Sequence, residues 1–177
     1  MKKFYNRHMV AVNLVSPEEY LASGLEFPAE YVDGILLPKQ MPTRLHAQLQ
    51  AWISALLLQR YAHFVISTEL ICRLSESEFR LPDIAVELRA NTLGSTIATE
   101  PLYLAIEIRS SGDRFGAALS KLERYHDWGV PHCWLIEPEQ RRVWAYDRGQ
   151  EAVLATSQLD AGEISLSVAE IFSILDR

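Results

Sequence analysis

Two short apolar segments, each carrying one carboxylate, constrain the fold of this chain more than any other feature. Residues 81–86 contain Asp83, and residues 102–111 contain Glu107. Both segments are rich in β-forming residues and predict strands. Because strand residues alternate between two faces, Glu107 and Arg109 are expected on one face, and the apolar residues Leu104, Ile106 and Ile108 on the other. A buried carboxylate is costly without a partner, so we expect Asp83 and Glu107 to face a metal ion or a cation.

The segment after the second strand has the period of an amphipathic helix, from about Arg114 to Trp128, and Gly129 then supplies a C-terminal cap. Lys121 falls within the apolar arc of this helix, whose stripe consists of Phe115, Ala118, Leu122 and Tyr125. A lysine on the inward side of a helix beside the Glu107 strand is where an active-site lysine is expected. The alternative is a lysine at the edge of the stripe that extends its ammonium group into solvent.

The rest of the chain alternates helical and strand-like patterns. Ser16 and Glu19 form a capping box for a short helix, and Asp33-Gly34 predicts a type I′ hairpin over residues 29–38. Further predicted elements are a long helix from Thr43 to about Ala62, a strand from Phe64 to Leu74, a polar turn at 75–78, a polar connector at 89–100, strands at 132–137 and 142–146, and a weak strand with a last short helix over 165–175. We therefore predict one α/β domain over residues 1–177, with about the first 15 residues peripheral.

Composition narrows the function classes. The chain has 177 residues, of which 49% are hydrophobic and 23% charged, so it can bury a sizeable core. No apolar run approaches the roughly 18 residues of a membrane helix, and the basic start lacks the apolar stretch of a signal peptide. Cys72 and Cys133 share no CxxC spacing. We expect a cytoplasmic protein without membrane contact and with two buried thiols, a disulfide being the alternative.

The net charge of −6 argues against broad non-specific binding of nucleic acid, which requires clustered cations. A local basic groove remains compatible with the sequence, because several cations fall close to the two carboxylate-bearing strands. These are Arg80, Arg109, Arg114, Lys121 and Arg124.

Two carboxylates at the ends of adjacent strands, with a lysine nearby, suit metal-dependent hydrolysis of a phosphodiester bond. Oxygen ligands hold Mg²⁺ or Mn²⁺, which polarises the phosphate and lowers the pKa of the attacking water. The main-chain carbonyl of Ile108 is a possible further ligand, and the helix lysine can orient water or stabilise developing charge. In the structural alternative, Asp83 caps a turn and Glu107 pairs with Arg109 or Arg114.

Other candidate chemistries have less support. His46 opens the long helix and could approach the site, although a lone histidine there is more often a polar residue of the helix face. The other histidines show no metal-ligand spacing, and the chain has neither a GxSxG motif nor a glycine-rich phosphate loop.

The order and spacing of these motifs resemble the Uma-two (Uma2) family, restriction-endonuclease-like proteins of the PD-(D/E)xK nuclease superfamily. The resemblance covers roughly residues 16–175. The residues that carry it are Glu30-Tyr31-Val32-Asp33-Gly34, His46, Pro82-Asp83, Glu107-Ile108-Arg109-Ser110, Lys121, Tyr125, Gly129-Val130-Pro131 and Trp134-Leu135-Ile136-Glu137-Pro138.

This resemblance implies a restriction-endonuclease-like fold, a central mixed sheet flanked by helices, and often a homodimer. It implies a metal-dependent DNA endonuclease in which Asp83 and Glu107 bind Mg²⁺ or Mn²⁺ and Lys121 is the catalytic lysine. Glu30 matches an upstream acidic residue that can join the site. Arg109 stands where the wider superfamily keeps a lysine on the strand, as expected when that lysine has moved to the helix.

The chain departs from the family pattern in two places. Ala117 stands where an acidic residue usually precedes the helix lysine by four positions, and Ser110-Ser111-Gly112 replaces a Ser-Pro-Ser segment. A second hypothesis is therefore a catalytically inactive nuclease-fold protein that binds nucleic acid or protein.

Overall fold

The computed structural model describes residues 14–24, 28–110, 112 and 114–176. Most of the predicted peripheral segment, residues 1–15, lies outside these ranges, as do Ser111 and Asp113, which precede the helix predicted from about Arg114. The elements are α1 (Pro17–Ala22), β1 (Ala29–Val32), β2 (Ile35–Pro38), α2 (Arg44–Arg60), β3 (Phe64–Thr68), β4 (Cys72–Ser75), β5 (Glu78–Arg80), β6 (Ile84–Leu88), η1 (Arg89–Thr92), β7 (Leu104–Ile108), α3 (Phe115–Trp128), β8 (His132–Glu137), β9 (Arg142–Asp147), β10 (Val153–Ala155), β11 (Gln158–Ala161), β12 (Ile164–Ser167), α4 (Val168–Phe172) and η2 (Ser173–Asp176).

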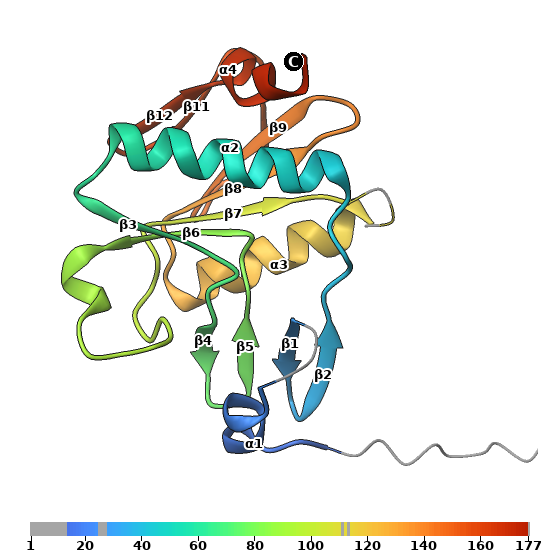
Figure 1. The fold of residues 1–177 in the computed structure, drawn as a ribbon, viewed down its shortest axis with the longest axis vertical. Helices are drawn as coiled ribbons and strands as arrows, with labels where there is room; N and C mark the ends of the chain where they lie inside the picture. The colour runs from blue at the N-terminus through green and yellow to red at the C-terminus, as the bar shows by residue number, and fades with distance from the viewer. Residues whose placement is uncertain (1–13, 25–27, 111, 113, 177) are drawn as a thin grey trace, which may run out of the picture.

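The central element is a six-stranded sheet with the order β10-β9-β8-β7-β6-β3 (Figure 1). β7 and β8 are parallel, and every other neighbouring pair is antiparallel, so the sheet is mixed. Parallel neighbours need a crossover connection, and α3 provides it between β7 and β8. The predicted α/β architecture with a central mixed sheet and flanking helices is confirmed.

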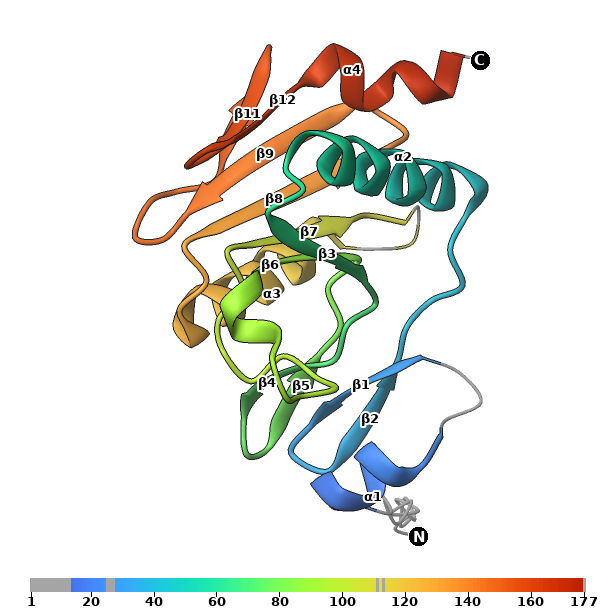
Figure 2. The same ribbon diagram turned by 60° about the vertical axis from the view of Figure 1, so that its left-hand side comes forward.

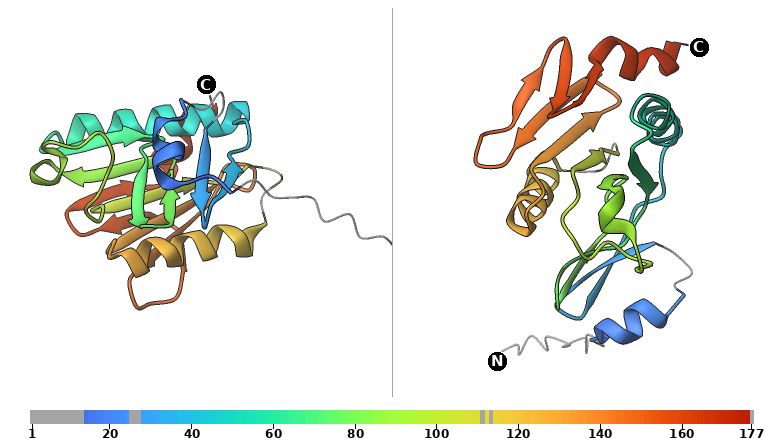
Figure 3. Two further views of the ribbon diagram at one scale, coloured as in Figure 1. Left: turned by 90° about the horizontal axis from the view of Figure 1, so that it is seen from below. Right: turned by 90° about the vertical axis from the view of Figure 1, so that its left-hand side faces the viewer.

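The two faces of this sheet are covered by different helices, α2 on one side and α3 on the other (Figure 3). The core beneath α2 includes Leu104, Ile106 and Ile108 of β7. The core beneath α3 includes Ala105 of the same strand together with Leu122. The alternation predicted for this strand is thus observed, and it places Glu107 on the α3 side.

A second sheet, with the order β2-β1-β5-β4, lies at one end of the molecule with α1 beyond it (Figure 2). Its hairpin forms at Asp33-Gly34, where both residues have positive φ (48° and 84°), as a type I′ turn requires. β5 continues through residues 81–83 into β6, so this linker joins the two sheets.

The single strand predicted from Phe64 to Leu74 is wrong. β3 ends at Thr68 and β4 begins at Cys72, and the two strands belong to different sheets. The break lies at Glu69, whose φ of 53° is left-handed and cannot continue an extended strand. The polar turn predicted at 75–78 is also two residues too long, because Ser75 belongs to β4 and Glu78 to β5.

At the opposite end, β11 and β12 form a hairpin that is followed by α4. Ser167 caps α4 by accepting a hydrogen bond from the Glu170 N–H, as predicted. β5, β10 and β11 were not predicted. Cys72 and Cys133 are buried free thiols, in agreement with the sequence expectation. Among the described residues, no helix is both long and apolar enough to span a bilayer. The assignment of residues 1–177 to one domain stays a prediction.

Candidate functional site

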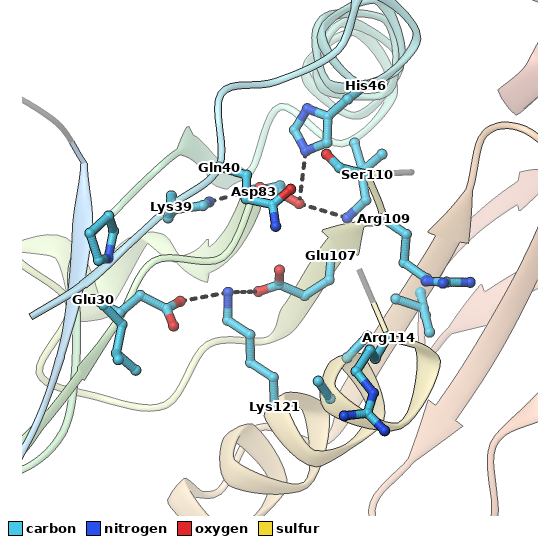
Figure 4. A pocket seen from close by; sticks show the side chains of 16 residues that line it. Glu30, Lys39, Gln40, His46, Asp83, Glu107, Arg109, Ser110, Arg114 and Lys121 are labelled. Carbon is cyan, nitrogen blue, oxygen red and sulfur yellow. Dashed lines mark hydrogen bonds and ion pairs between the residues drawn. The ribbon is translucent and has the colours of Figure 1, made fainter. Parts of the chain in front are cut away.

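A cavity of about 270 Å³ opens where the linker between the two sheets meets β7 and α3 (Figure 4). Every site residue named from the sequence lines it. These residues are Glu30, His46, Asp83, Glu107, Ile108, Arg109 and Lys121. They come from both sheets and both large helices, so the cavity exists only when the two sheets are assembled.

Asp83 is the most deeply buried of the three carboxylates that line the cavity and is only 2% exposed. One oxygen, Oδ2, accepts a hydrogen bond from the Ile108 N–H at 2.6 Å and lies 3.2 Å from His46 Nε2. The other, Oδ1, lies 2.8 Å from Lys39 Nζ. Burial would raise the pKa of Asp83, but the hydrogen bond from His46 and the charges of Lys39 and His46 outweigh it and hold the pKa well below its usual range.

Glu107 is set differently in the same cavity. The side chain points from β7 toward α3 and is 11% exposed. Its Oε1 lies 2.8 Å from Lys121 Nζ and accepts a hydrogen bond from the Tyr125 hydroxyl at 2.7 Å. Burial raises the pKa of Glu107 to about 7, the Lys121 charge opposing and the Asp83 charge adding to the shift.

Lys121 lies between two carboxylates rather than at the solvent edge of its helix (Figure 4). Its Nζ is 2.5 Å from Glu30 Oε1 and 2.8 Å from Glu107 Oε1, and it donates to the Leu81 carbonyl at 3.4 Å. Burial would lower the pKa of Lys121, but Glu107 and Glu30 outweigh it and raise the pKa above its usual value. The lysine therefore remains a cation. It does not extend its ammonium group into solvent, which was the alternative considered from the sequence.

Glu30 connects Lys121 to the second sheet. Its Oε2 accepts from Arg80 NH1 at 2.9 Å, and its Oε1 accepts from the Leu81 N–H at 3.2 Å. Burial would raise the pKa of Glu30, but Lys121 and Arg80 lower it. Glu30 therefore stays ionised and holds the lysine from the side opposite Glu107.

Arg109 and Ile108 complete the set named from the sequence. Arg109 forms an ion pair with Glu137, and its guanidinium lies 5.5 Å from the ring centre of Phe115. The structural alternative paired Glu107 with a nearby arginine, whereas the partner observed is Lys121.

Lys39 was missed by sequence reasoning. It follows β2, lines the cavity, and contacts Asp83, Glu69 and the Leu81 carbonyl. No periodic pattern marks a lysine in a short extended linker. The energetic cost of burying Asp83 indicated that a cationic partner was needed, but it did not identify which residue supplies it.

The donors in this cavity fit a hard divalent ion. No group of three or more His, Cys, Asp or Glu side chains able to hold a metal is present in the part of the chain that the structure describes. Mg²⁺ commonly uses one or two carboxylates, its other positions being filled by water and phosphate oxygens. The carboxylates of Asp83 and Glu107 line this one cavity and are donors of this kind.

Comparison with solved structures defines the class of fold. The crystal structure of a "putative nuclease belonging to DUF820" from Anabaena variabilis superposes with a TM-score of 0.77 and 23% sequence identity, covering 91% of this chain and 99% of that one. A DrdV–DNA complex matches with a TM-score of 0.39 and 11% identity, over 72% of this chain and 10% of the other, and this low similarity supports no inference. The mixed sheet with its flanking helices resembles the restriction-endonuclease-like fold.

A match between the sequence and a protein-family model identifies the family. Residues 17–174 match Uma2, described as "Putative restriction endonuclease", and the chain belongs to this family. Comparison with curated protein sequences found no match.

Proposed function

We propose that this protein is a metal-dependent endonuclease that hydrolyses phosphodiester bonds in DNA. The observation that carries the proposal is the meeting of Asp83, Glu107 and Lys121 in one cavity, with the lysine ammonium 2.8 Å from the Glu107 carboxylate. Membership of a family described as "Putative restriction endonuclease" supports the same reaction class.

In this proposal Asp83, Glu107 and the Ile108 carbonyl hold Mg²⁺ or Mn²⁺. A bound ion of this kind polarises the scissile phosphate and lowers the pKa of the attacking water. Asp83 suits the role because its lowered pKa keeps it ionised at neutral pH. Tyr125 orients Glu107 through its hydroxyl hydrogen bond, and His46 and the Ile108 N–H orient Asp83.

Lys121 is proposed as the catalytic lysine. Its ammonium is held by Glu30 and Glu107 and points into the cavity, so it can orient water and stabilise negative charge that develops on the phosphate oxygens. Glu30 serves as a positioning residue that sets the direction of this ammonium group.

DNA is proposed as the substrate because cations line a cavity in an otherwise acidic protein. Arg109 and Arg114 line it beside the start of α3, together with Lys39 and Lys121. Phosphate contacts require such a local cluster rather than a basic surface overall. The homodimer and the cytoplasmic location expected from the sequence stay predictions.

A second function has one observation in its favour. Ala117 lines the cavity at the position where the family usually carries an acid. A protein that retains the fold but binds nucleic acid or another protein without cleaving it would keep the cavity and lose the reaction.

The test is nicking of supercoiled plasmid in Mg²⁺ or Mn²⁺. We expect nicking by the wild-type protein, loss of at least about a hundredfold in Glu107→Ala and in Lys121→Met, and wild-type nicking in Glu123→Gln. Glu123 is the matched control because it is an exposed glutamate of α3 outside this cavity. Nicking that persists unchanged in Glu107→Ala would contradict the assignment, and DNA binding without nicking by the wild type would favour the second function.

A further inference from the structure

Lys39 binds the carboxylate that the proposed metal would need. Its Nζ lies 2.8 Å from Asp83 Oδ1 and donates to the Leu81 carbonyl at 2.9 Å. The lysine side chain is 17% exposed and that of Asp83 is 3% exposed, so water screens this ion pair poorly. Asp83 is thus already paired with a cationic side chain of the protein itself.

A divalent ion and the Lys39 ammonium group would repel each other if both bound the Asp83 carboxylate. Both are cations that seek the same oxygens, and at these distances in a partly buried site their repulsion is strong. An ion that binds Asp83 must therefore move the lysine away, and the free energy of breaking its contact weakens the binding of the ion.

Lys39 already has a second carboxylate within reach. Its Nζ is 2.5 Å from Glu69 Oε2, and Gln50 donates to the other oxygen of Glu69 at 3.1 Å. The Glu69 side chain is 35% exposed, so it lies toward solvent relative to Asp83. The unusual backbone of Glu69, with a φ of 53°, brings this side chain to the edge of the site between the two sheets.

The two lysines of the cavity differ in this respect. Lys121 is held by Glu30 and Glu107, two carboxylates that are both buried. Lys39 is shared between a buried carboxylate and a partly exposed one, so it has a place to go when Asp83 takes another partner.

We propose that Lys39 is a resident counter-cation of Asp83 that a divalent ion displaces, and that Glu69 retains the displaced ammonium group. The inference rests on the proposed function, since it assumes that Asp83 is a metal ligand. It assigns to Lys39 and Glu69 the control of metal affinity, a role separate from the chemical step.

The test is a titration of Mn²⁺ into the full-length protein at 0.15 M salt, followed by calorimetry or by the electron paramagnetic resonance signal of the free ion. We expect Lys39→Met to bind Mn²⁺ about ten to a hundred times more tightly than the wild type, the equivalent of one charge-assisted hydrogen bond. Glu69→Gln should bind it several-fold more weakly, because the lysine then has only Asp83. Arg142→Gln is the matched control, since it removes an exposed charge of β9 outside the cavity, and its affinity should change less than about twofold.

The double variant Lys39→Met/Glu69→Gln separates displacement from simple charge effects. If Glu69 acts by receiving Lys39, the double variant binds Mn²⁺ as tightly as Lys39→Met. Independent, additive effects of the two changes would overturn the proposal, as would unchanged or weaker binding in Lys39→Met, provided that circular dichroism shows a folded protein. Glu69→Gln tests the proposal separately if Lys39→Met does not fold.

Asp83→Asn distinguishes failure of this inference from failure of the proposed function. If Mn²⁺ binding is equal in the wild type and in Asp83→Asn, the proposed metal site itself is wrong. If Asp83→Asn abolishes binding while Lys39→Met leaves it unchanged, the metal site stands and only the role of Lys39 is overturned.

Discussion

The two sides of the cavity hold their carboxylates in opposite ways. One side is formed by α2 and by residues 81–83, the linker between the two sheets. Here Asp83 accepts a hydrogen bond from a main-chain N–H and contacts His46 and Lys39, and its pKa is lowered. On the side of α3, Glu107 lies against Lys121 and Tyr125, and burial raises its pKa to about 7. The two groups face the same cavity, yet one stays ionised and the other titrates near neutral pH.

The difference follows from the number and kind of donors. Asp83 precedes β6 in a linker where the backbone of β7 and two side chains can all reach it, so its charge is well compensated. Glu107 sits within a strand whose α3 face is apolar, and it shares its lysine with Glu30. Environments that separate the pKa values of two carboxylates are typical of catalytic pairs. The comparison therefore predicts opposite responses to neutral replacements at the two positions.

The largest effect is expected for Asp83→Asn. This change removes a buried negative charge that both His46 and Lys39 contact and leaves Lys39 with Glu69 alone, so the free energy of unfolding at pH 7 should fall by about 3 to 5 kcal/mol. The measurement is urea denaturation followed by circular dichroism. Asp127→Asn is the control, because Asp127 pairs with Arg124 at an exposed site, and its loss should cost less than about 1 kcal/mol. If Asp83→Asn is as stable as the wild type, the charge of Asp83 does not contribute to stability through its contacts with His46 and Lys39.

Glu107→Gln should show the reverse behaviour, and it depends on pH. The folded-state pKa of Glu107 is raised from 4.5 to about 7, so the folded protein keeps a proton that the unfolded chain loses. The wild type therefore loses stability as pH rises between these values, by roughly 3 kcal/mol, whereas the neutral glutamine does not. The two proteins should be similar near pH 4.5, and Glu107→Gln should be the more stable above pH 7.

The measurement is the difference in unfolding free energy between wild type and Glu107→Gln from pH 4.5 to 8. Asp83 does not interfere, because its stabilising contribution is complete above its usual pKa of 3.8 and is lost only at lower pH. A difference that stays constant across this range would mean that Glu107 is ionised throughout, and the contrast between the two carboxylates would disappear.

The α3 side of the cavity could be predicted from sequence, whereas much of the other side could not. Helical period placed Lys121 on the inward arc, and strand alternation placed Glu107 on the matching face. Lys39 lies in a linker without any period, so its role depends on how the two sheets assemble. Periodicity reports which way a side chain points within an element, and it carries no information on contacts between linkers.

The same limit explains the errors in the fold. β-forming residues continue on both sides of Glu69, so composition predicted one strand where a single left-handed residue divides two. β10 has only three residues and shows no alternation, whereas β11 alternates between exposed and buried residues but over only four positions, too few for a clear strand signal. The hairpin at Asp33-Gly34 was predictable because its turn chemistry is local.

The smallest effect is expected for Tyr125→Phe, which removes the hydroxyl that donates to Glu107 at 2.7 Å and keeps the buried ring. A hydrogen bond to a charged acceptor contributes about 1.5 to 3 kcal/mol and one to a neutral acceptor about 1 kcal/mol, so the cost should grow as Glu107 ionises. We therefore expect Tyr125→Phe to destabilise the protein more at pH 8 than at pH 5, as measured by thermal unfolding. Tyr146→Phe is the control, because no hydrogen bond of its hydroxyl to another described residue is present, and its small cost should not vary with pH. An equal cost of Tyr125→Phe at both pH values would show that the contribution of this hydrogen bond does not depend on the ionisation of Glu107. The proposed contrast in pKa between Glu107 and Asp83 would then lose this support.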